Sequence, residues 1–428
     1  MRKYILHSIA AVLAFGLMFG ADVTKAQTIG GHHAGTLDST FGTRGTVTSR
    51  LGVTVNPVSA IEQSNGNIVV VAGVNNGQPS VSDFALLVYT SNGTMIGVTR
   101  VAFGSNLYNN PIAAVVQPNG DIIVAGTSAS VINESSEFAL ARFTPNGQLD
   151  PTFGRGGLVS TIFSNPCCDT AFMSFASLLL QPNGQIVVGG SAPPGTKHGP
   201  GMTVLARYDS NGSLDTTFGV GGTVEEVPAP VNPAALALLT DGSYLAAGGP
   251  SSVVEFSSTG VLQSTVTPGT VEAANQSASG CCSQVLFQPN GDYLVAQLGP
   301  GLGRRGSDVQ VFRFSETGTL DTTFISTPFN FGGNPQNTPQ AIILQANGQI
   351  VVGGLTNDHG TPVTGGLARL DANGQLDTAF ASGGSLMTQP VISGLQIQTD
   401  GKIVTVGNIG DPANRDIADL SISRYLGN

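Results

Sequence analysis

The sequence ARFTPNGQLDPTFG, residues 141–154, decides the fold because close copies of it recur along the chain. The copies are ARYDSNGSLDTTFG (206–219), FRFSETGTLDTTF (312–324) and ARLDANGQLDTAF (368–380). The central Pro145-Asn146-Gly147 is typical of a three-residue hairpin loop, since Pro favours a type I turn and Gly accepts the left-handed conformation. Each copy therefore predicts two antiparallel strands joined by a tight turn.

An Arg and an Asp occupy matching positions in these hairpins. With the predicted loop, Arg142 lies directly opposite Asp150, and a cross-strand pair of opposite charges contributes roughly 0.2–1 kcal/mol. The same spacing gives the pairs Arg142/Asp150, Arg207/Asp215, Arg313/Asp321 and Arg369/Asp377. Two degenerate hairpins, centred on Gly93 and Gly260, lack the Arg, the Asp and the Phe of the motif together. Contact among the three side chains predicts this joint loss, and shared descent of two diverged repeats would produce it too. A structural role is preferred to a catalytic one because the pairs repeat around the whole ring.

A second family of turns, Asn-Gly or Asp-Gly, precedes β-rich runs such as QIVVGG (185–190). Seven of them are spaced 49 to 64 residues apart, at Asn65, Asn119, Asn183, Asp241, Asn290, Asn347 and Asp400. Each repeat therefore predicts four short strands in two hairpins. Seven such units predict an all-β fold, a seven-bladed β-propeller of four-stranded antiparallel blades. An open β-solenoid is the alternative architecture.

One Asp and one Arg of the motif are left over at the two ends of the chain. Asp38 lies in LDSTFG (37–42) with no hairpin before it, and Arg424 lies four residues before the last residue. We expect Arg424 to face Asp38. Residues 37–47 would then supply the outermost strand of the seventh blade and residues 395–425 the other three, so that N-terminal strand pairing closes the ring.

The first 26 residues predict a secretory signal peptide. Arg2 and Lys3 precede an apolar run, and Thr24-Lys25-Ala26 offers a cleavage site. A single transmembrane anchor is the alternative. We therefore expect a secreted, periplasmic or cell-surface protein with one propeller domain over residues 27–428, and no membrane insertion after signal cleavage.

The composition restricts the partners. The chain has 17 Lys and Arg against 27 Asp and Glu, for a formal net charge of −10, and no basic run. Acidic chains of this kind do not attract nucleic acid or anionic membrane surfaces. No phosphate-binding loop or dinucleotide-binding motif is present, so we expect no cofactor.

Four cysteines, in two adjacent pairs, lie in loops of variable sequence. These disulfide candidates are Cys167, Cys168, Cys281 and Cys282. Export favours disulfides, with three pairings open. A metal site is disfavoured, because adjacent cysteines lack the spacing of zinc ligands. His198 and His359 are interpreted as solvated loop residues.

The combined pattern of NGxIVVxG followed by ARYxxNGxLDxTFG resembles the delta-60 repeat family of bacterial surface and secreted proteins. The resemblance covers essentially residues 37–428. It implies a propeller-like β architecture and an exported location, and it supplies no reaction or catalytic residues.

The function predicted from the sequence is an exported, monomeric, non-catalytic binding or scaffold propeller rather than an enzyme. A protein or cell-surface polymer would bind on the variable connections between hairpins, because ligand contacts tend to lie on loops of a rigid scaffold. The alternative is a polysaccharide lyase or glycosidase that uses loop carboxylates, and a third possibility is a purely structural array. Four carboxylates open third strands of repeats, where ordinary strand-edge charge is the preferred interpretation: Asp83, Glu137, Asp308 and Asp419. Arg304-Arg305 is the basic doublet of the variable loops.

Overall fold

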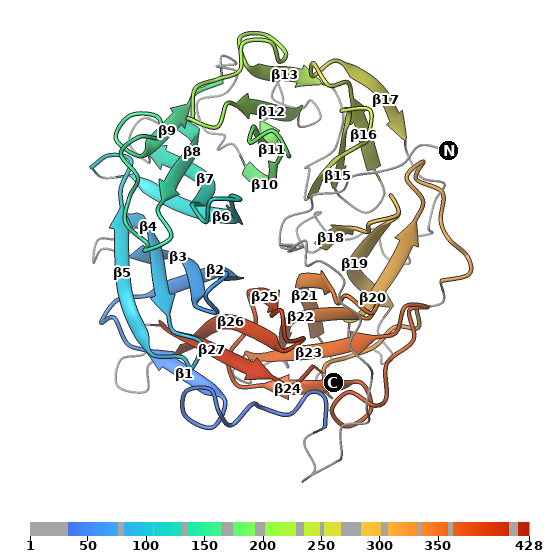
Figure 1. The fold of residues 1–428 in the computed structure, drawn as a ribbon. Helices are drawn as coiled ribbons and strands as arrows, with labels where there is room; N and C mark the ends of the chain where they lie inside the picture. Colours follow the sequence, from blue (N-terminus) through green and yellow to red (C-terminus); the bar gives the residue numbers. More distant parts are fainter. Residues whose placement is uncertain are drawn as a thin grey trace, which may run out of the picture.

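Short antiparallel strands are arranged radially around a central axis (Figure 1). The computed structural model describes residues 33–75, 81–105, 107–130, 135–163, 174–192, 202–227, 235–248, 252–266, 284–300, 307–324, 326–332, 336–357, 363–410 and 418–427. Within these ranges all regular structure is strand, which confirms the all-β propeller predicted from the repeats. Among the same residues, no helix is long and apolar enough to cross a bilayer.

The described strands form seven blades, numbered here in chain order, each starting from its innermost strand. Blades 1 and 2 contain β2 (Val55–Glu62), β3 (Ile68–Asn75), β4 (Ser82–Tyr89) and β5 (Met95–Val101), then β6 (Tyr108–Val116), β7 (Ile122–Ser130), β8 (Ser135–Phe143) and β9 (Leu158–Thr161). Blades 3 and 4 contain β10 (Ser174–Leu180), β11 (Ile186–Ala192), β12 (Met202–Tyr208) and β13 (Thr223–Val227), then β14 (Ala235–Leu238), β15 (Tyr244–Gly248), β16 (Ser252–Phe256) and β17 (Leu262–Val266). Blades 5 and 6 contain β18 (Gln284–Phe287), β19 (Tyr293–Pro300) and β20 (Ser307–Phe314), then β21 (Gln336–Leu344), β22 (Ile350–Asn357), β23 (Thr364–Leu370) and β24 (Ser385–Thr388). Blade 7 contains β25 (Gly394–Ile397), β26 (Ile403–Gly410), β27 (Ala418–Tyr425) and β1 (Thr46–Ser49).

Strand β1 joins the two ends of the chain in one sheet. It pairs antiparallel with β27, from Thr46 opposite Ser423 to Ser49 opposite Leu420. The strand was predicted within residues 37–47, and its actual bounds lie further on because residues 38–45 form the turn of the Arg/Asp motif. Thr46 and Val47 of β1 and an isolated bridge between Leu37 and Tyr425 fall within the predicted range.

Blade 5 departs from the four-strand prediction. In place of a regular outer strand, its described residues form a single bridge between Val309 and Phe329, with hydrogen bonds of 2.8 and 2.9 Å in the two directions. Pro328 precedes that bridge, and proline has no N–H to continue a ladder. The edge strand is therefore reduced to one residue pair.

The hydrophobic core is divided among the seven junctions between neighbouring blades. Each of the seven clusters of buried side chains combines two adjacent blades, including one between blade 7 and blade 1. In β4, for example, Ala85 and Leu87 face blade 7, whereas Leu86 and Val88 face blade 2. A single blade cannot bury both of its faces, so the ring as a whole supplies the core.

The Arg/Asp hairpins link neighbouring blades as well as their own strands. Arg142 Nε donates to Asp150 Oδ2 at 2.7 Å, and its guanidinium lies 4.8 Å from the centre of the Phe153 ring. Arg142 Nη1 donates to the carbonyl of Ser210, in the hairpin of blade 3, at 2.6 Å. We call this set of three contacts the Arg clamp.

Clamps occur at five of the seven junctions of the described chain. They are built on Arg142, Arg207, Arg313, Arg369 and Arg424, each with a charged partner, a phenylalanine beneath it and a carbonyl acceptor in the next blade. In the closing clamp, Arg424 Nε donates to Asp38 Oδ2 at 2.9 Å and Nη1 donates to the carbonyl of Ser91 at 2.6 Å. The structure thus brings together the five Arg/Asp pairs of the sequence, including the pair across the closure.

Asp377 forms the pair that the spacing predicts, in a clamp that lacks the threonine of the other four. Arg369 Nε donates to Asp377 Oδ2 at 2.9 Å, so the pair itself forms. Residue 379 is alanine, however, whereas a threonine at the matching place donates its hydroxyl to the aspartate in the other four clamps: Thr40, Thr152, Thr217 and Thr323. Asp377 is half-buried, as is Asp321, whereas Asp38, Asp150 and Asp215 are buried. It receives a bond from Gln349 Nε2 at 2.7 Å, so a glutamine from the neighbouring strand supplements this clamp.

The clamp also explains why glycine ends the hairpin loop. Gly212 of blade 3 has φ +88°, which favours glycine, and a Cβ on it would lie 2.9 Å from Cε2 of Phe153 in blade 2. Neighbouring blades therefore approach closely only where this turn carries no side chain.

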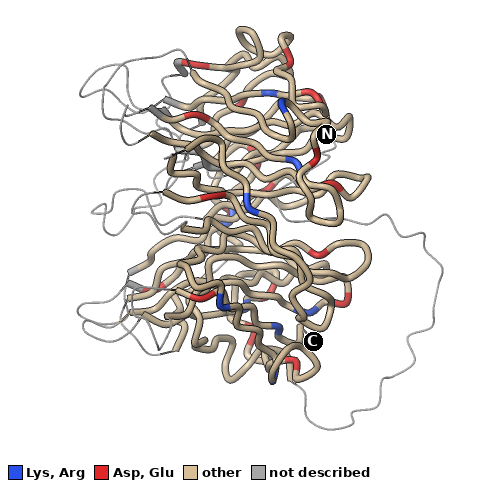
Figure 2. The backbone as a smooth tube through the Cα atoms, turned by 90° about the vertical axis from the view of Figure 1, so that its left-hand side faces the viewer, with Lys and Arg blue, Asp and Glu red and all other residues tan. Residues whose placement is uncertain are grey.

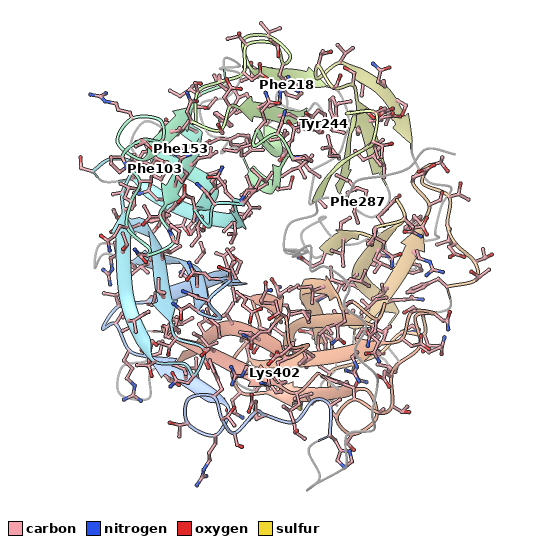
Figure 3. All side chains as sticks on the ribbon, viewed as in Figure 1. Phe103, Phe153, Phe218, Tyr244, Phe287 and Lys402 are labelled. Carbon is pink, nitrogen blue, oxygen red and sulfur yellow. The ribbon has the colours of Figure 1, made fainter. Side chains whose placement is uncertain are left out.

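Two buried tyrosines at matching positions show what loss of a clamp does. Tyr244 packs edge-on against Phe218 at the junction of blades 3 and 4 (Figure 3), and its hydroxyl accepts hydrogen bonds from Arg207 and Gln181. Tyr293 has the same place at the junction of blades 4 and 5, where Glu255 replaces the Arg and Leu239 the Gln. Its hydroxyl is buried and has no hydrogen-bond partner among the described residues.

Replacing these two tyrosines should have opposite effects. Tyr244→Phe should lower the free energy of unfolding by about 1–3 kcal/mol, because two buried donors lose an acceptor. Tyr293→Phe should leave it unchanged or raise it by up to about 1 kcal/mol, because it removes a hydroxyl that is already unsatisfied. Chemical denaturation of both variants measures the difference, and equal losses would contradict the assignment.

The closing clamp should make the ring sensitive to acid. Burial by itself would raise the pKa of Asp38, but hydrogen bonds from the Thr40 hydroxyl and amide, with the charges of Arg424 and Lys402, outweigh it and lower the pKa from 3.8 to about 2. Because the folded pKa is depressed, this stabilisation is complete above about pH 5 and is lost as pH falls through 3.8 towards 2.

We therefore expect Asp38→Asn to flatten the dependence of stability on pH between about pH 5 and pH 2, removing about 2 kcal/mol of it. Thermal unfolding across that range is the measurement. Asp292→Asn is the matched control. Asp292 lies at a hairpin turn, where it accepts a hydrogen bond from Asn290, and its replacement should leave the dependence of stability on pH unchanged. A pH profile of Asp38→Asn parallel to that of the parent chain would show that the closing pair does not carry this stability.

Candidate functional site

Antiparallel strand order places the two kinds of connection on opposite faces of the ring. The tight Asn-Gly type hairpins lie on one face, and the connections from second to third strand and from blade to blade lie on the other, which we call the variable-loop face. Several predicted residues belong to connections outside the described residues. These are Cys167, Cys168, Cys281, Cys282, His198, His359, Arg304 and Arg305.

The clamps belong to the turn face. Each clamp arginine lies near the hairpin end of its strand, five residues after the position of the variable-loop carboxylates, or roughly 16 Å along a strand. In each clamp the arginine contacts both the aspartate and the phenylalanine ring, as Arg142 contacts Asp150 and Phe153. The clamps are therefore part of the framework that holds the variable-loop face.

The four carboxylates singled out in the sequence occupy the same position in blades 1, 2, 5 and 7 but have different surroundings. Glu137 Oε1 accepts a hydrogen bond from Ser160 at 2.8 Å, as strand-edge charge usually does. Asp83 is half-buried. Asp308 is buried and has partners of its own, so it fits the structural interpretation.

Asp419 on β27 differs from the other three. Its side chain is 2% exposed, and neither carboxylate oxygen has a hydrogen-bond partner among the described residues. Arg50 Nε lies 3.3 Å from Oδ2, but the Arg50 side chain is 66% exposed and the contact is electrostatic rather than a hydrogen bond. Burying a carboxylate with its lone pairs unused costs free energy, so the ordinary strand-edge interpretation does not account for this residue.

A short connection ties Asp419 to the top of blade 1. Arg50 begins the link from β1 to β2, and at its end the Thr54 carbonyl accepts a hydrogen bond from the Asn75 amide at 3.0 Å. Asn75 follows Val74, which is the register partner of Asp83. Asp419 and Asp83 therefore lie near the two ends of one link of five residues.

An exposed aromatic residue lies next to the strand end that carries Asp83. Tyr108 begins β6, is 42% exposed and pairs with Ser82, the neighbour of Asp83. Residue type alone singled out Asp83 and Asp419, but it missed Arg50 and Tyr108, because their place beside these carboxylates depends on pairing between strands that are far apart in the sequence. We take Asp419, Arg50, Asp83 and Tyr108 as the candidate site.

The charges around this site are sparse. Figure 2 shows Lys and Arg as scattered single residues over the part of the chain that the structure describes. Within that part, no group of three or more His, Cys, Asp and Glu comes together to hold a metal ion. The chemistry that the described site offers is that of carboxylates.

Three segments of the chain match a family model described as a domain of unknown function (DUF5122) beta-propeller, at residues 117–153, 181–218 and 345–380. The match supports a propeller repeat family, as predicted, while the narrower delta-60 assignment stays a prediction. No curated protein matches the chain.

Solved propellers resemble the whole chain. A protein of unknown function from Dyadobacter fermentans has a TM-score of 0.46 and 11% identity, covering 90% of this chain and 100% of its own. An α-L-arabinanase from Penicillium chrysogenum, complexed with arabinobiose, has a TM-score of 0.46 and 15% identity, covering 89% and 96%. An α-L-arabinofuranosidase from Fusarium graminearum, bound to an iminosugar inhibitor, has a TM-score of 0.46 and 13% identity, covering 93% and 98%. Identities of this size concern the fold.

The non-catalytic binding scaffold predicted from the sequence is contradicted by these matches. The arabinanase and the arabinofuranosidase are enzymes by name, and a glycosidase was the alternative that the sequence offered. The prediction failed because the repeats report on the scaffold, which propellers with and without catalysis share.

Asp419 should behave unlike a structural aspartate. Asp419→Asn should keep or raise the melting temperature, because it removes a buried charge that no hydrogen bond satisfies. Asp308→Asn, at the matching and equally buried position of blade 5, should lower the free energy of unfolding by about 1–3 kcal/mol. Thermal and denaturant unfolding of both variants make the comparison, and a loss in Asp419→Asn as large as in Asp308→Asn would assign Asp419 to the framework.

Proposed function

We propose that the protein is a glycosidase whose reaction centre lies on the variable-loop face around Asp419. The observation that supports this proposal is the Asp419 carboxylate, which is buried, lacks hydrogen bonds among the described residues and lies beside the exposed Arg50 side chain. Strained or unsatisfied polar groups of this kind are typical of functional sites.

Carboxylates alone are enough for this reaction. Glycoside hydrolysis needs two carboxyl groups, one that protonates the leaving oxygen and one that acts as nucleophile or activates water, held about 5–9.5 Å apart. Asp83, at the other end of the link from Arg50 to Thr54, is the second carboxyl group in our proposal. Asp83 is on the strand face of Ala85 and Leu87, toward blade 7, whereas Asp419 is on the strand face of Tyr425, toward blade 6, so the proposal requires the two carboxyl groups to meet over the end of blade 7. The exposed Tyr108 ring beside it is suited to stack on a sugar face.

The arabinobiose complex of the Penicillium propeller suggests the first substrates to try, namely arabinan and α-L-arabinofuranosides. The signal peptide predicted for residues 1–26 agrees with action on an external polymer. We accordingly propose an exported enzyme built from repeats of the delta-60 type.

Hydrolysis of a panel of plant and bacterial polysaccharides, led by arabinan and followed by product analysis, tests the proposal. We expect the parent chain to release oligosaccharides or monosaccharides. Asp419→Asn should lower kcat by about 10²–10⁴-fold without loss of folding, which is the range for removal of a general acid or base. Asp83→Asn should do the same.

Asp292→Asn on the turn face is the matched control and should keep full activity. Hydrolysis that survives in both Asp419→Asn and Asp83→Asn would overturn the assignment of these residues. A parent chain that releases no product from any polysaccharide of the panel would overturn the proposed activity itself.

A further inference from the structure

The five Arg clamps leave two junctions of the ring without one. The clamps join blades 2 and 3, 3 and 4, 5 and 6, 6 and 7, and 7 and 1. At the junctions of blades 1 and 2 and of blades 4 and 5, the clamp position holds Val88 and Glu255. Both blades that lack the Arg also start their outer strand directly after the hairpin, at Met95 and Leu262.

Three of the five clamped junctions have a second directional bond of one kind besides the arginine. In three of the clamped blades the glycine that follows the motif phenylalanine donates its amide to the next hairpin: Gly42 to Asn92, Gly154 to Asn211 and Gly219 to Thr259, at 2.7–2.8 Å. Blades 1 and 4 have no such glycine in their hairpins, because the whole LDxTFG turn is missing. Their junctions therefore depend more on apolar contact, which is not directional.

The junction of blades 1 and 2 keeps polar links of another kind. Ser82 Oγ donates to the Asn109 carbonyl and Asn109 Nδ2 donates to the Ser82 carbonyl, both at 2.7 Å. On the turn face, Gln63 Nε2 donates to the Pro145 carbonyl at 2.7 Å. This junction is therefore linked at both faces of the ring, although its clamp position holds the apolar Val88.

The junction of blades 4 and 5 lacks both the Gln and the Arg that reach from one blade to the next elsewhere in the repeats. Six repeats have Gln at the position before the first turn, and blade 4 has Leu239 there. Glu255 stands in place of the Arg, and the Tyr293 hydroxyl that these two side chains would meet is buried without a partner among the described residues. Among the described residues, this junction is packed by the apolar cluster that includes Phe287 (Figure 3), Tyr293 and Phe314. The ring centres of Phe287 and Tyr293 lie 5.7 Å apart, and those of Tyr293 and Phe314 lie 5.2 Å apart.

These two junctions lie on opposite sides of the ring (Figure 1). They divide it into an arc of blades 2–4 and an arc of blades 5, 6, 7 and 1, each clamped throughout. A closed ring can open at one junction only if a second junction bends as a hinge. The two unclamped junctions lie across from each other and can take these two parts.

We infer that the ring opens reversibly between blades 4 and 5 while the junction of blades 1 and 2 acts as its hinge. Each arc moves as one body, because its clamps would have to break for its own blades to separate. This opening does not require the glycosidase activity, so the two can fail independently.

Thiol labelling at buried alanines of the junctions tests the inference in the full-length chain. Ala247 faces the junction of blades 4 and 5, Ala206 that of blades 2 and 3, and Ala368 that of blades 5 and 6, and all three are at most 1% exposed. Single Ala→Cys variants are labelled under native conditions, and peptide mass spectrometry follows the new cysteine separately from the native ones. We expect Ala247→Cys to react at least about tenfold faster than the other two, which corresponds to an opening about 1.4 kcal/mol easier.

Removal of a clamp should reproduce the opening elsewhere. In the Ala368→Cys chain, Arg313→Ala removes the clamp between blades 5 and 6 and should raise the labelling rate at that junction towards that of Ala247→Cys. Arg155→Ala, at an exposed arginine outside the clamps, is the matched control and should not change the rate. Equal labelling rates at the three alanines would overturn the inference, and so would a rate in Ala368→Cys that Arg313→Ala leaves unchanged.

Discussion

The Arg clamp is the interaction on which the rest of the ring depends. A guanidinium removed from water costs several kcal/mol unless its donors and its charge are satisfied. Here Arg207 meets Asp215, Thr217, the Tyr244 hydroxyl and a backbone carbonyl of the next blade, while its flat face lies 4.7 Å from the centre of Phe218. The same side chain therefore fixes the hairpin of its own blade and the distance to the next one. Loss of any partner leaves the others buried and unpaired, which explains why the motif residues are absent together in blades 1 and 4.

The clamp frees the opposite face of the blades from a structural task. Strand-to-strand pairing and the apolar clusters hold each blade in place, and the turn face carries the Arg clamps. The variable-loop face can then tolerate a group such as Asp419, whose burial without hydrogen bonds works against stability. A framework with five clamps offsets one unsatisfied carboxylate, and this is the arrangement expected where a function needs a residue that folding does not.

Much of the fold followed from local rules in the sequence. The Pro-Asn-Gly loop sets the hairpin register, so the Phe143–Leu149 bridge and the Arg142–Asp150 contact follow from turn chemistry. The unmatched Asp38 and Arg424 predicted which ends of the chain meet, and the two do meet. The bounds of β1 and the reduced edge of blade 5 were not predicted, because both depend on where a neighbouring turn or Pro328 interrupts the ladder. The half-buried state of Asp377 was not predicted either, because the exposure of a paired aspartate depends on what surrounds its hairpin in the closed ring.

By itself, the sequence determined the repeat, the propeller and the pairs that close it, because turns and cross-strand contacts are encoded over a few residues and repeated along the chain. Only the tertiary structure decided which of four similar carboxylates is exceptional. Asp83, Glu137, Asp308 and Asp419 share one position in the repeat, and their differences come from hydrogen-bond partners on other strands and in other blades. The same holds for the two unclamped junctions. The missing arginines are visible in the sequence. The Tyr293 hydroxyl without a partner among the described residues, and the opposite placement of the two junctions, exist only once the ring has closed.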